Sequence, residues 1–141
     1  MCRSPEAYVP PAVAMQAHSA PLGITFYQWT EPKTRPDHCA NVAAFPQAMD
    51  GFAFIAFHGS WNRAVPTGYK VVYVPMDENG NVMASADGDS TSPVIDLLAH
   101  APPNAQFRPV DVEFDSCGRL LVSSDGSPRN GVYQGSKIVR I

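Results

Sequence analysis

The sequence predicts an all-β fold, and three observations support that class. Fourteen prolines and ten glycines make the chain rich in turns and poor in helix signals. Short apolar, β-branched and aromatic runs alternate with turn-forming residues, as in antiparallel sheets. The order of these runs repeats along the chain. Tandem units of three or four antiparallel strands are typical of β-propeller blades, so we expect about two blades of a propeller.

Seven strand candidates follow one another, separated by turns and loops. The clearest is the apolar run 51–57, and 69–74 is rich in β-branched and aromatic residues. Residues 28–50 form a polar loop punctuated by prolines, and an Asn-Gly pair at 79–80 signals a tight turn. In chain order, the expected strands are 21–27, 51–57, 69–74, 94–98, 108–114, 119–123 and 137–141.

The repeat appears when 51–74 is laid on 118–141 without a gap, a shift of 67 residues. Apolar positions then fall on apolar positions. His58 falls on Asp125, directly after the second strand of each unit. The alternative is two unrelated β-meanders with matching turns, since glycine and serine recur at turns anyway. The ungapped register favours a true repeat.

The first strands of the two units match as well, because Pro21 lies 88 residues before Pro109 in the same kind of apolar run. The larger shift reflects the greater length of the first unit's loop. We therefore divide the chain into an irregular lead-in, 1–17, and two units of about 18–98 and 107–141.

Two units cannot close a propeller, which takes roughly four to eight blades. The second unit also stops at its third strand. We therefore expect the C-terminal part of a larger protein, or a truncated gene product. Alone, such a chain is expected to expose strand edges and apolar faces and to be prone to aggregation.

Composition and missing motifs narrow the function. Ten basic and thirteen acidic residues, with no basic run, argue against nucleic acid as a partner. No apolar stretch approaches the roughly twenty residues of a membrane span, and 1–6 lacks a signal-peptide core. The sequence contains no nucleophile elbow, zinc-protease helix, P-loop or dinucleotide-binding glycine motif.

Three cysteines, Cys2, Cys39 and Cys117, are widely spaced. Without a Cys-x-x-C pair there is little support for a zinc site or a redox pair, and we assign no metal ligand in this chain. A disulfide between Cys39 and Cys117 suits an oxidising compartment, but spacing alone leaves the pairing open.

Two polar residues at strand ends are the main site candidates. His58 follows the apolar strand and either donates to an anionic or quinonoid ligand or caps the backbone of its turn. Arg108 directly precedes Pro109, which favours an extended backbone that can aim the guanidinium at a site. The alternative for Arg108 is an ion pair with Asp111 or Asp115.

Four further residues are weaker candidates. Trp61 either stacks on a planar ligand or packs between the units. Asn62 is by default a turn residue, and Arg63 either binds a carboxylate or is solvated. His18 occupies a place in the first unit close to that of Arg108 in the second.

Several of these segments together resemble a known family. They are similar to the sorbosone/pyranose dehydrogenase group of pyrroloquinoline-quinone-dependent sugar dehydrogenases, which is similar to soluble glucose dehydrogenase. The resemblance runs from about His18 to Ile141, and its most specific part is the His-Gly-Ser-Trp-Asn-Arg run. The segments that carry it are His18-Ser19-Ala20-Pro21-Leu22-Gly23, Phe57-His58-Gly59-Ser60-Trp61-Asn62-Arg63, Gly68-Tyr69-Lys70-Val71-Val72 and Arg108-Pro109-Val110-Asp111-Val112.

The resemblance implies a six-bladed propeller that binds pyrroloquinoline quinone over its central channel, near a calcium ion. A sugar hydroxyl or aldehyde would be oxidised by hydride transfer to the quinone, with a histidine as general base and an external electron acceptor. The family is typically secreted or periplasmic. The sugar, the acceptor, the oligomeric state and the identity of the base are not readable from the sequence.

For this chain, the resemblance implies that His58 and Arg108 contact the cofactor. The further cofactor-binding candidates are His18, Trp61, Asn62 and Arg63. The base and most calcium ligands are expected on blades outside this chain, so we expect the chain alone to be inactive. The alternative is a non-catalytic propeller fragment that binds sugar or protein.

Overall fold

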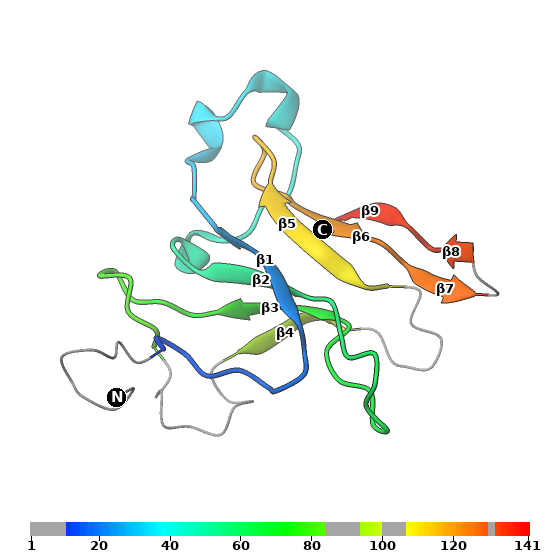
Figure 1. Cartoon of the computed structure of the whole chain (residues 1–141). Coiled ribbons are helices and arrows are strands. Elements are labelled where there is room, and N and C mark those ends of the chain that lie inside the picture. Colours follow the sequence, from blue (N-terminus) through cyan, green and yellow to red (C-terminus); the bar gives the residue numbers. More distant parts are fainter. Residues whose placement is uncertain (1–10, 84–93, 100–106, 130–131) are drawn as a thin grey trace.

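The computed structural model describes residues 11–83, 94–99, 107–129 and 132–141, and these form an all-β structure (Figure 1). Most of the lead-in 1–17 and part of the 84–106 segment lie outside the described residues. A four-stranded antiparallel sheet has the order β1-β2-β3-β4, and a three-stranded sheet the order β5-β6-β9. The strands are β1 (Pro21–Phe26), β2 (Ala53–Phe57), β3 (Lys70–Val74), β4 (Ile95–Ala99), β5 (Pro109–Phe114), β6 (Leu120–Ser124), β7 (Ser127–Arg129), β8 (Val132–Gln134) and β9 (Lys137–Arg140).

Strand pairing confirms that the chain repeats. Ile24 of β1 pairs with Ile55 of β2. Val112 and Val122, which lie 88 and 67 residues further along the chain as predicted, form the equivalent pair of β5 with β6. The β2–β3 and β6–β9 ladders also match residue by residue. Two unrelated β-meanders would not be expected to share the residue-by-residue pairing of all these strands.

Glycine conformations repeat in the same way. Each matched pair has a positive φ, a backbone region that favours glycine. The corresponding turns of the two units therefore have similar backbone conformations at these glycines. The pairs are Gly51 and Gly118 (φ 78° and 78°), Gly59 and Gly126 (97° and 72°), and Gly68 and Gly135 (88° and 85°).

The two units differ in two places. No described strand follows β9 as β4 follows β3. In the second unit, β7 and β8 form a hairpin between β6 and β9, which the sequence analysis did not predict. The long loop of the first unit contains three single-turn 3-10 helices, each preceded or begun by a proline: η1 (Pro32–Thr34), η2 (Asp37–Cys39) and η3 (Gln47–Met49).

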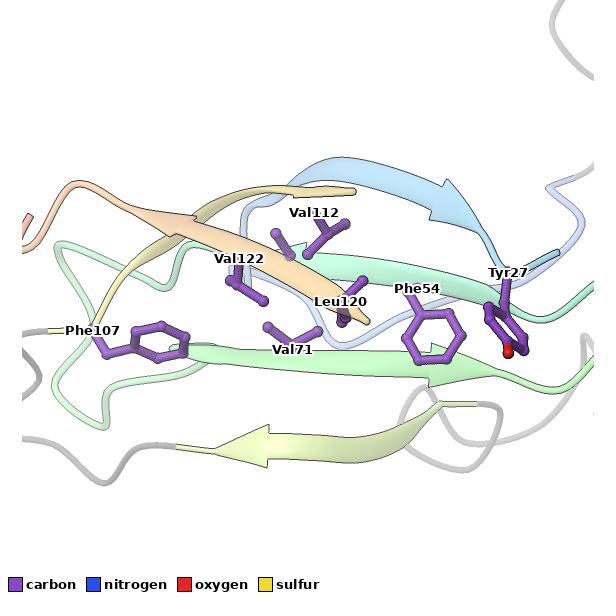
Figure 2. Packing of buried hydrophobic residues seen from close by; sticks show 8 residues of the cluster. Tyr27, Phe54, Val71, Phe107, Val112, Leu120 and Val122 are labelled. Atoms are coloured by element: carbon purple, nitrogen blue, oxygen red, sulfur yellow. The ribbon is translucent and has the colours of Figure 1, made fainter. Parts of the chain in front are cut away.

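The main core lies between the two sheets (Figure 2). Phe54 of β2 and Val71 of β3 face Leu120 and Val122 of β6, and all four are fully buried. By the 67-residue shift, Leu120 corresponds to Ala53 and not to Phe54. Successive residues of a strand lie on opposite faces of the sheet, so the face that the first sheet turns to the core is opposite to the one that the second sheet uses. The packing is therefore head to tail. The opposite face of the first sheet is also buried, in a second cluster against which Met15, Met76 and Val82 pack: Ala53, Ile55, Phe57, Val72, Val74 and Val94.

An aromatic cluster closes one end of this core. Phe54 packs edge-on against Phe45 and Phe114, with ring centroids 5.2 and 5.0 Å away. Tyr27 lies 4.8 Å from Phe114, and its hydroxyl donates to the Phe45 carbonyl at 2.7 Å. Burial raises the pKa of Tyr27, which therefore stays a neutral donor. The long loop thus covers the core through Phe45.

A disulfide ties this loop to the second unit. Cys39 and Cys117 are bonded, with Cα atoms 5.2 Å apart, so the pairing that spacing left open is settled. Within the turn that carries Cys117, Asp115 accepts hydrogen bonds from the backbone of Cys117 and Arg119 and from the Arg119 guanidinium. Burial raises the pKa of Asp115, but these bonds outweigh it and hold the pKa below its usual value.

Candidate functional site

Three polar side chains meet at one end of the two sheets. Arg108 lies just before β5, His58 just after β2 and Asp125 just after β6. In an antiparallel sheet, the start of one strand and the end of its neighbour share an edge, so these positions converge. Equivalent backbone hydrogen bonds fix these positions in the two units. His58 N donates to the Ala20 carbonyl at 3.0 Å, and Asp125 N donates to the Arg108 carbonyl at 3.3 Å.

The three side chains form a continuous hydrogen-bonded row. Arg108 Nη2 lies 3.0 Å from His58 Nδ1, and His58 Nε2 lies 3.0 Å from Asp125 Oδ2. A guanidinium only donates, so Nδ1 must accept and the imidazole proton must sit on Nε2, facing the carboxylate. His58 is therefore neutral in this row. The sequence also allowed the His58 side chain to cap the backbone of its turn. In the structure that side chain bonds to Arg108 and Asp125 instead.

Each end of the row has an unused hydrogen-bonding atom. Arg108 Nε and Asp125 Oδ1 are both buried and have no partner among the described residues. Buried polar atoms in proteins nearly always have a partner, because an unsatisfied one costs about 1–3 kcal/mol. The row therefore contains one unsatisfied donor and one unsatisfied acceptor, and neither atom is exposed to solvent among the described residues. Arg108 does not pair with Asp111 or Asp115, the alternative considered from sequence.

The guanidinium of Arg108 is held from three sides. Besides His58, it donates from Nη2 to the Gly59 carbonyl at 3.1 Å. Its central carbon lies 5.5 Å from the ring centroid of Tyr69, within the range of a cation–π contact. The Arg108 backbone N–H donates to Ser124 Oγ at 2.8 Å. Arg108 is thus oriented before any ligand arrives.

The backbone around Arg108 is tightly packed and strained. A Cβ on Gly59 would lie 2.7 Å from the Tyr69 ring, so only glycine fits there. Within the part of the chain that the structure describes, three non-glycine residues adopt positive φ, namely His18 (63°), Ala20 (51°) and Tyr69 (60°). Such conformations cost on the order of 1–3 kcal/mol and cluster at functional sites.

Comparison with known protein families decides the assignment. Residues 1–133 match the family described as TrAA12-like. The chain belongs to the TrAA12-like family.

Related proteins agree with this membership. The TrAA12-like chain is 37% identical over 109 residues to a pyrroloquinoline quinone-dependent pyranose dehydrogenase of Coprinopsis cinerea, covering 65% of this chain and 14% of that protein. It is also 37% identical over 70 residues to an uncharacterised protein of Borreliella burgdorferi, of which it covers 15%. The chain therefore spans about one seventh of these curated relatives.

Two solved structures are similar to the TrAA12-like chain. The calcium structure of a Trichoderma reesei carbohydrate-active enzyme of family AA12 superposes with a TM-score of 0.63 at 31% identity, over 84% of this chain and 25% of that one. The holo pyrroloquinoline quinone domain of the Coprinopsis cinerea pyranose dehydrogenase gives 0.58 at 29%, over 85% and 28%. The resemblance noted from sequence is thus supported for pyranose dehydrogenase, and not for sorbosone dehydrogenases specifically.

The weaker candidates lie apart from the row in the TrAA12-like chain. His18, Trp61, Asn62 and Arg63 are all exposed, and no hydrogen bond among the described residues joins them to His58 or Arg108. Trp61 is 86% exposed, so of the two alternatives considered from sequence, packing between the two described units is not observed.

Sequence reasoning missed Asp125 and Tyr69 as site residues. Asp125 was matched to His58 by the 67-residue shift, but equivalence in a repeat was not taken as contact. Neighbouring units that pack head to tail bring equivalent strand ends together, which is the signal that could have found Asp125. No such signal exists for Tyr69, whose ring reaches Arg108 only through its strained backbone.

Other features of the TrAA12-like chain lie elsewhere. A cleft of about 210 Å³ lies at the far ends of β1 and β5, beside the disulfide, and contains none of the candidate residues. His38 approaches the sulfur atoms of Cys39 and Cys117, but both sulfurs are consumed in the disulfide and offer no thiolate ligand. Within the described residues, no helix is long and apolar enough to cross a membrane.

Replacing Asp125 with alanine is expected to allow the imidazole proton of His58 to occupy Nδ1 as well as Nε2. The wild-type imidazole should carry its proton on Nε2, because Arg108 occupies Nδ1 and Asp125 accepts from Nε2. The measurement is ¹⁵N–¹H NMR of the imidazole nitrogens at a pH where His58 is neutral. In Asp125→Ala, partial Nδ1 protonation should appear. A mixed tautomer already present in the wild type would contradict the row described above.

Proposed function

We propose that this chain supplies part of the cofactor site of a quinone-dependent sugar dehydrogenase. The observation that carries the proposal is the row Arg108–His58–Asp125, with its buried unpaired Arg108 Nε and Asp125 Oδ1. The relationship to a pyrroloquinoline quinone-dependent pyranose dehydrogenase says which ligand such a site would take. Substrate and activity belong to the complete protein, of which this chain would be one portion.

The residues present suit pyrroloquinoline quinone. This cofactor carries three carboxylates, and a guanidinium is the side chain that best binds a planar carboxylate. The buried Nε of Arg108 is a donor without an acceptor, and a carboxylate or quinone oxygen would satisfy it once the groups that cover Nε move aside. Pre-orientation by His58, Gly59 and Tyr69 lowers the entropy that binding would otherwise cost.

Calcium is not accounted for by the described residues alone. A calcium ion takes 6–8 oxygen ligands, and this site offers one unpaired carboxylate oxygen, Asp125 Oδ1. That atom would accept a hydrogen bond from a sugar hydroxyl or water, or would contribute one ligand to an ion completed by other parts of the protein. The second option agrees with calcium ligands placed on further blades of a six-bladed propeller.

When bound, the quinone would accept the electrons and hydrogen removed from the sugar. Arg108 would bind its negative charge and keep it oriented. His58 would act as a positioning residue, because Arg108 occupies Nδ1 and Asp125 holds the proton on Nε2. Neither nitrogen is free to take a proton from a sugar hydroxyl, so the general base would come from another part of the protein.

The remaining details of the proposal rest on the resemblance and on exposure. His18, Trp61, Asn62 and Arg63 would contact the ligand only at its rim, since all are exposed. A secreted or periplasmic location is supported by the Cys39–Cys117 bond, because disulfides persist in oxidising compartments.

Direct quinone binding tests the proposal. Pyrroloquinoline quinone titrated into the chain should bind, as followed by quinone absorbance or calorimetry. Arg108→Ala should raise the dissociation constant at least about tenfold, because a hydrogen bond to a charged group contributes roughly 1.5–3 kcal/mol. Arg35→Ala is the matched control, since Arg35 lies in the long loop and donates to the Thr30 carbonyl. Equal effects of the two variants would contradict the proposal.

A further inference from the structure

A cleft of about 210 Å³ lies between the two units, at the ends of β1 and β5 opposite to the Arg108–His58–Asp125 row. Its first wall consists of residues between 26 and 35, from the end of β1 and the loop that follows. Its second wall consists of residues between 113 and 118, from the end of β5 and the turn after it (Figure 1). The two described units therefore form this cleft between them.

Both walls are held in place by bonds within the chain. The Cys39–Cys117 disulfide joins the loop of the first wall to the turn of the second. The buried Tyr27 donates from its hydroxyl to the Phe45 carbonyl at 2.7 Å, and Asp115 accepts from the Cys117 N–H at 2.9 Å. The cleft is thus formed before a ligand arrives, as most small-molecule sites are, and binding need not order its walls.

The two walls carry opposite charges that are not paired with each other. Arg35, on the first wall, donates from Nε to the Thr30 carbonyl at 3.0 Å. Glu113, on the second wall, accepts from the Phe114 N–H at 3.2 Å through Oε1. Among the described ion pairs, none joins Arg35 to Glu113. The cleft therefore has two guanidinium nitrogens on one wall and a carboxylate oxygen on the other, all without a described partner.

These charges favour a neutral ligand that both donates and accepts hydrogen bonds. The charges of Arg35 and Glu113 cancel, and the carboxylate of Asp115 is already paired with Arg119. An anion would lie against Glu113 and a cation against Arg35, whereas hydroxyl groups accept from a guanidinium and donate to a carboxylate. The volume is below the roughly 300–1,000 Å³ of sites for drug-sized ligands, which limits the ligand to about one ring.

We propose that this cleft binds one pyranose ring of a neutral sugar. Hydroxyls of the ring would bridge Arg35 and Glu113, and the ring of Phe26, which lines the same cleft, would pack against the apolar C–H face of the sugar. A zwitterionic amino acid would also satisfy the two charges. It has fewer groups for the neutral hydrogen-bonding side chains of the cleft, Gln28 and Ser116, which further sugar hydroxyls would reach.

Titration of methyl β-D-glucopyranoside into the full chain, followed by ¹⁵N–¹H NMR, tests the proposal. The backbone signals of 26–35 and 113–118 should shift and saturate. Glu113→Gln should weaken binding at least about tenfold, because it removes a charged acceptor, and Phe26→Ala about fivefold. The control is Glu78→Gln, in an exposed turn outside the cleft, which should bind as the wild type does.

Three results would overturn the proposal. The first is the absence of saturable shifts at the cleft, and the second is equal binding by Glu113→Gln and Glu78→Gln. The third is a cleft that responds to glycine or to sulfate and not to the glycoside. Far-UV circular dichroism of each variant checks that its sheets are kept, so that a loss of binding is not a loss of fold.

A pair of variants separates this proposal from that of the quinone site, on which it does not depend. Arg35→Ala should weaken glycoside binding at least about tenfold and leave quinone binding unchanged, and Arg108→Ala should do the reverse. If Arg108→Ala weakens the glycoside as much as Arg35→Ala does, the cleft is not the sugar site. Failure of the quinone to bind, with the glycoside still bound, would contradict the proposed function alone.

Discussion

Removing the Cys39–Cys117 disulfide is expected to lower the free energy of unfolding by about 4 kcal/mol. The bond joins residues 78 apart, and closing a loop of that length restricts the unfolded chain strongly. It also anchors the long loop, whose Phe45 covers the core. The measurement is urea unfolding of Cys39→Ser/Cys117→Ser beside the wild type, both followed by circular dichroism.

The matched control for the disulfide is Ser116→Ala, an exposed neighbour in the same turn. It should leave the unfolding midpoint almost unchanged. A loss of less than about 1 kcal/mol in the double serine variant would show that the loop is held by its packing and not by the bond.

Phe54→Ala is expected to cost about 3–5 kcal/mol of unfolding free energy, the usual range for emptying a buried aromatic site. Phe54 is fully buried and stands where the two units meet, in contact with Phe45, Tyr73 and Phe114. Its loss would leave a cavity in the core between the two sheets. Thermal or urea unfolding measures the effect.

Phe26→Ala is the comparison for Phe54→Ala. Phe26 lies on β1 with its side chain 53% exposed, so its removal should cost less than about 1 kcal/mol. Similar losses for the two variants would mean that the space between the sheets is not the core that stabilises the chain.

The strands and their repeat were predictable because both depend on local pattern. Alternating apolar and β-branched residues mark each strand, and glycines that need positive φ recur at the same turns, as at Gly51 and Gly118. The 67-residue shift also relates the β2–β3 ladder to the β6–β9 ladder, residue by residue.

Features that depend on distance in space were not predictable in the same way. The Cys39–Cys117 bond needs the long loop to return to the β5–β6 turn, which spacing cannot show. The β7–β8 hairpin is too short to leave a clear pattern. The sequence left open whether Trp61 stacks on a ligand or packs between the units, and only the folded chain shows that its side chain is mostly exposed.

The sequence predicted two of the residues at the candidate site and missed Asp125 and Tyr69. His58 and Arg108 were identified, since each stands at a strand end with chemistry suited to an anionic ligand. The role of His58 changed when its contacts were known. An imidazole bonded on both nitrogens holds Arg108 in place, and Asp125 fixes its tautomer. This dependence between residues of different units exists only in the folded chain.

The most direct test of the account replaces the matching segment of the Coprinopsis cinerea pyranose dehydrogenase with this chain and measures quinone-dependent oxidation of a pyranose by dye reduction. We predict that the folded chimaera is active, that Arg108→Ala lowers its kcat/KM at least about tenfold, and that Arg35→Ala does not. A folded, quinone-loaded chimaera whose activity is the same with and without Arg108 and His58 would contradict the central claim that this row holds the cofactor.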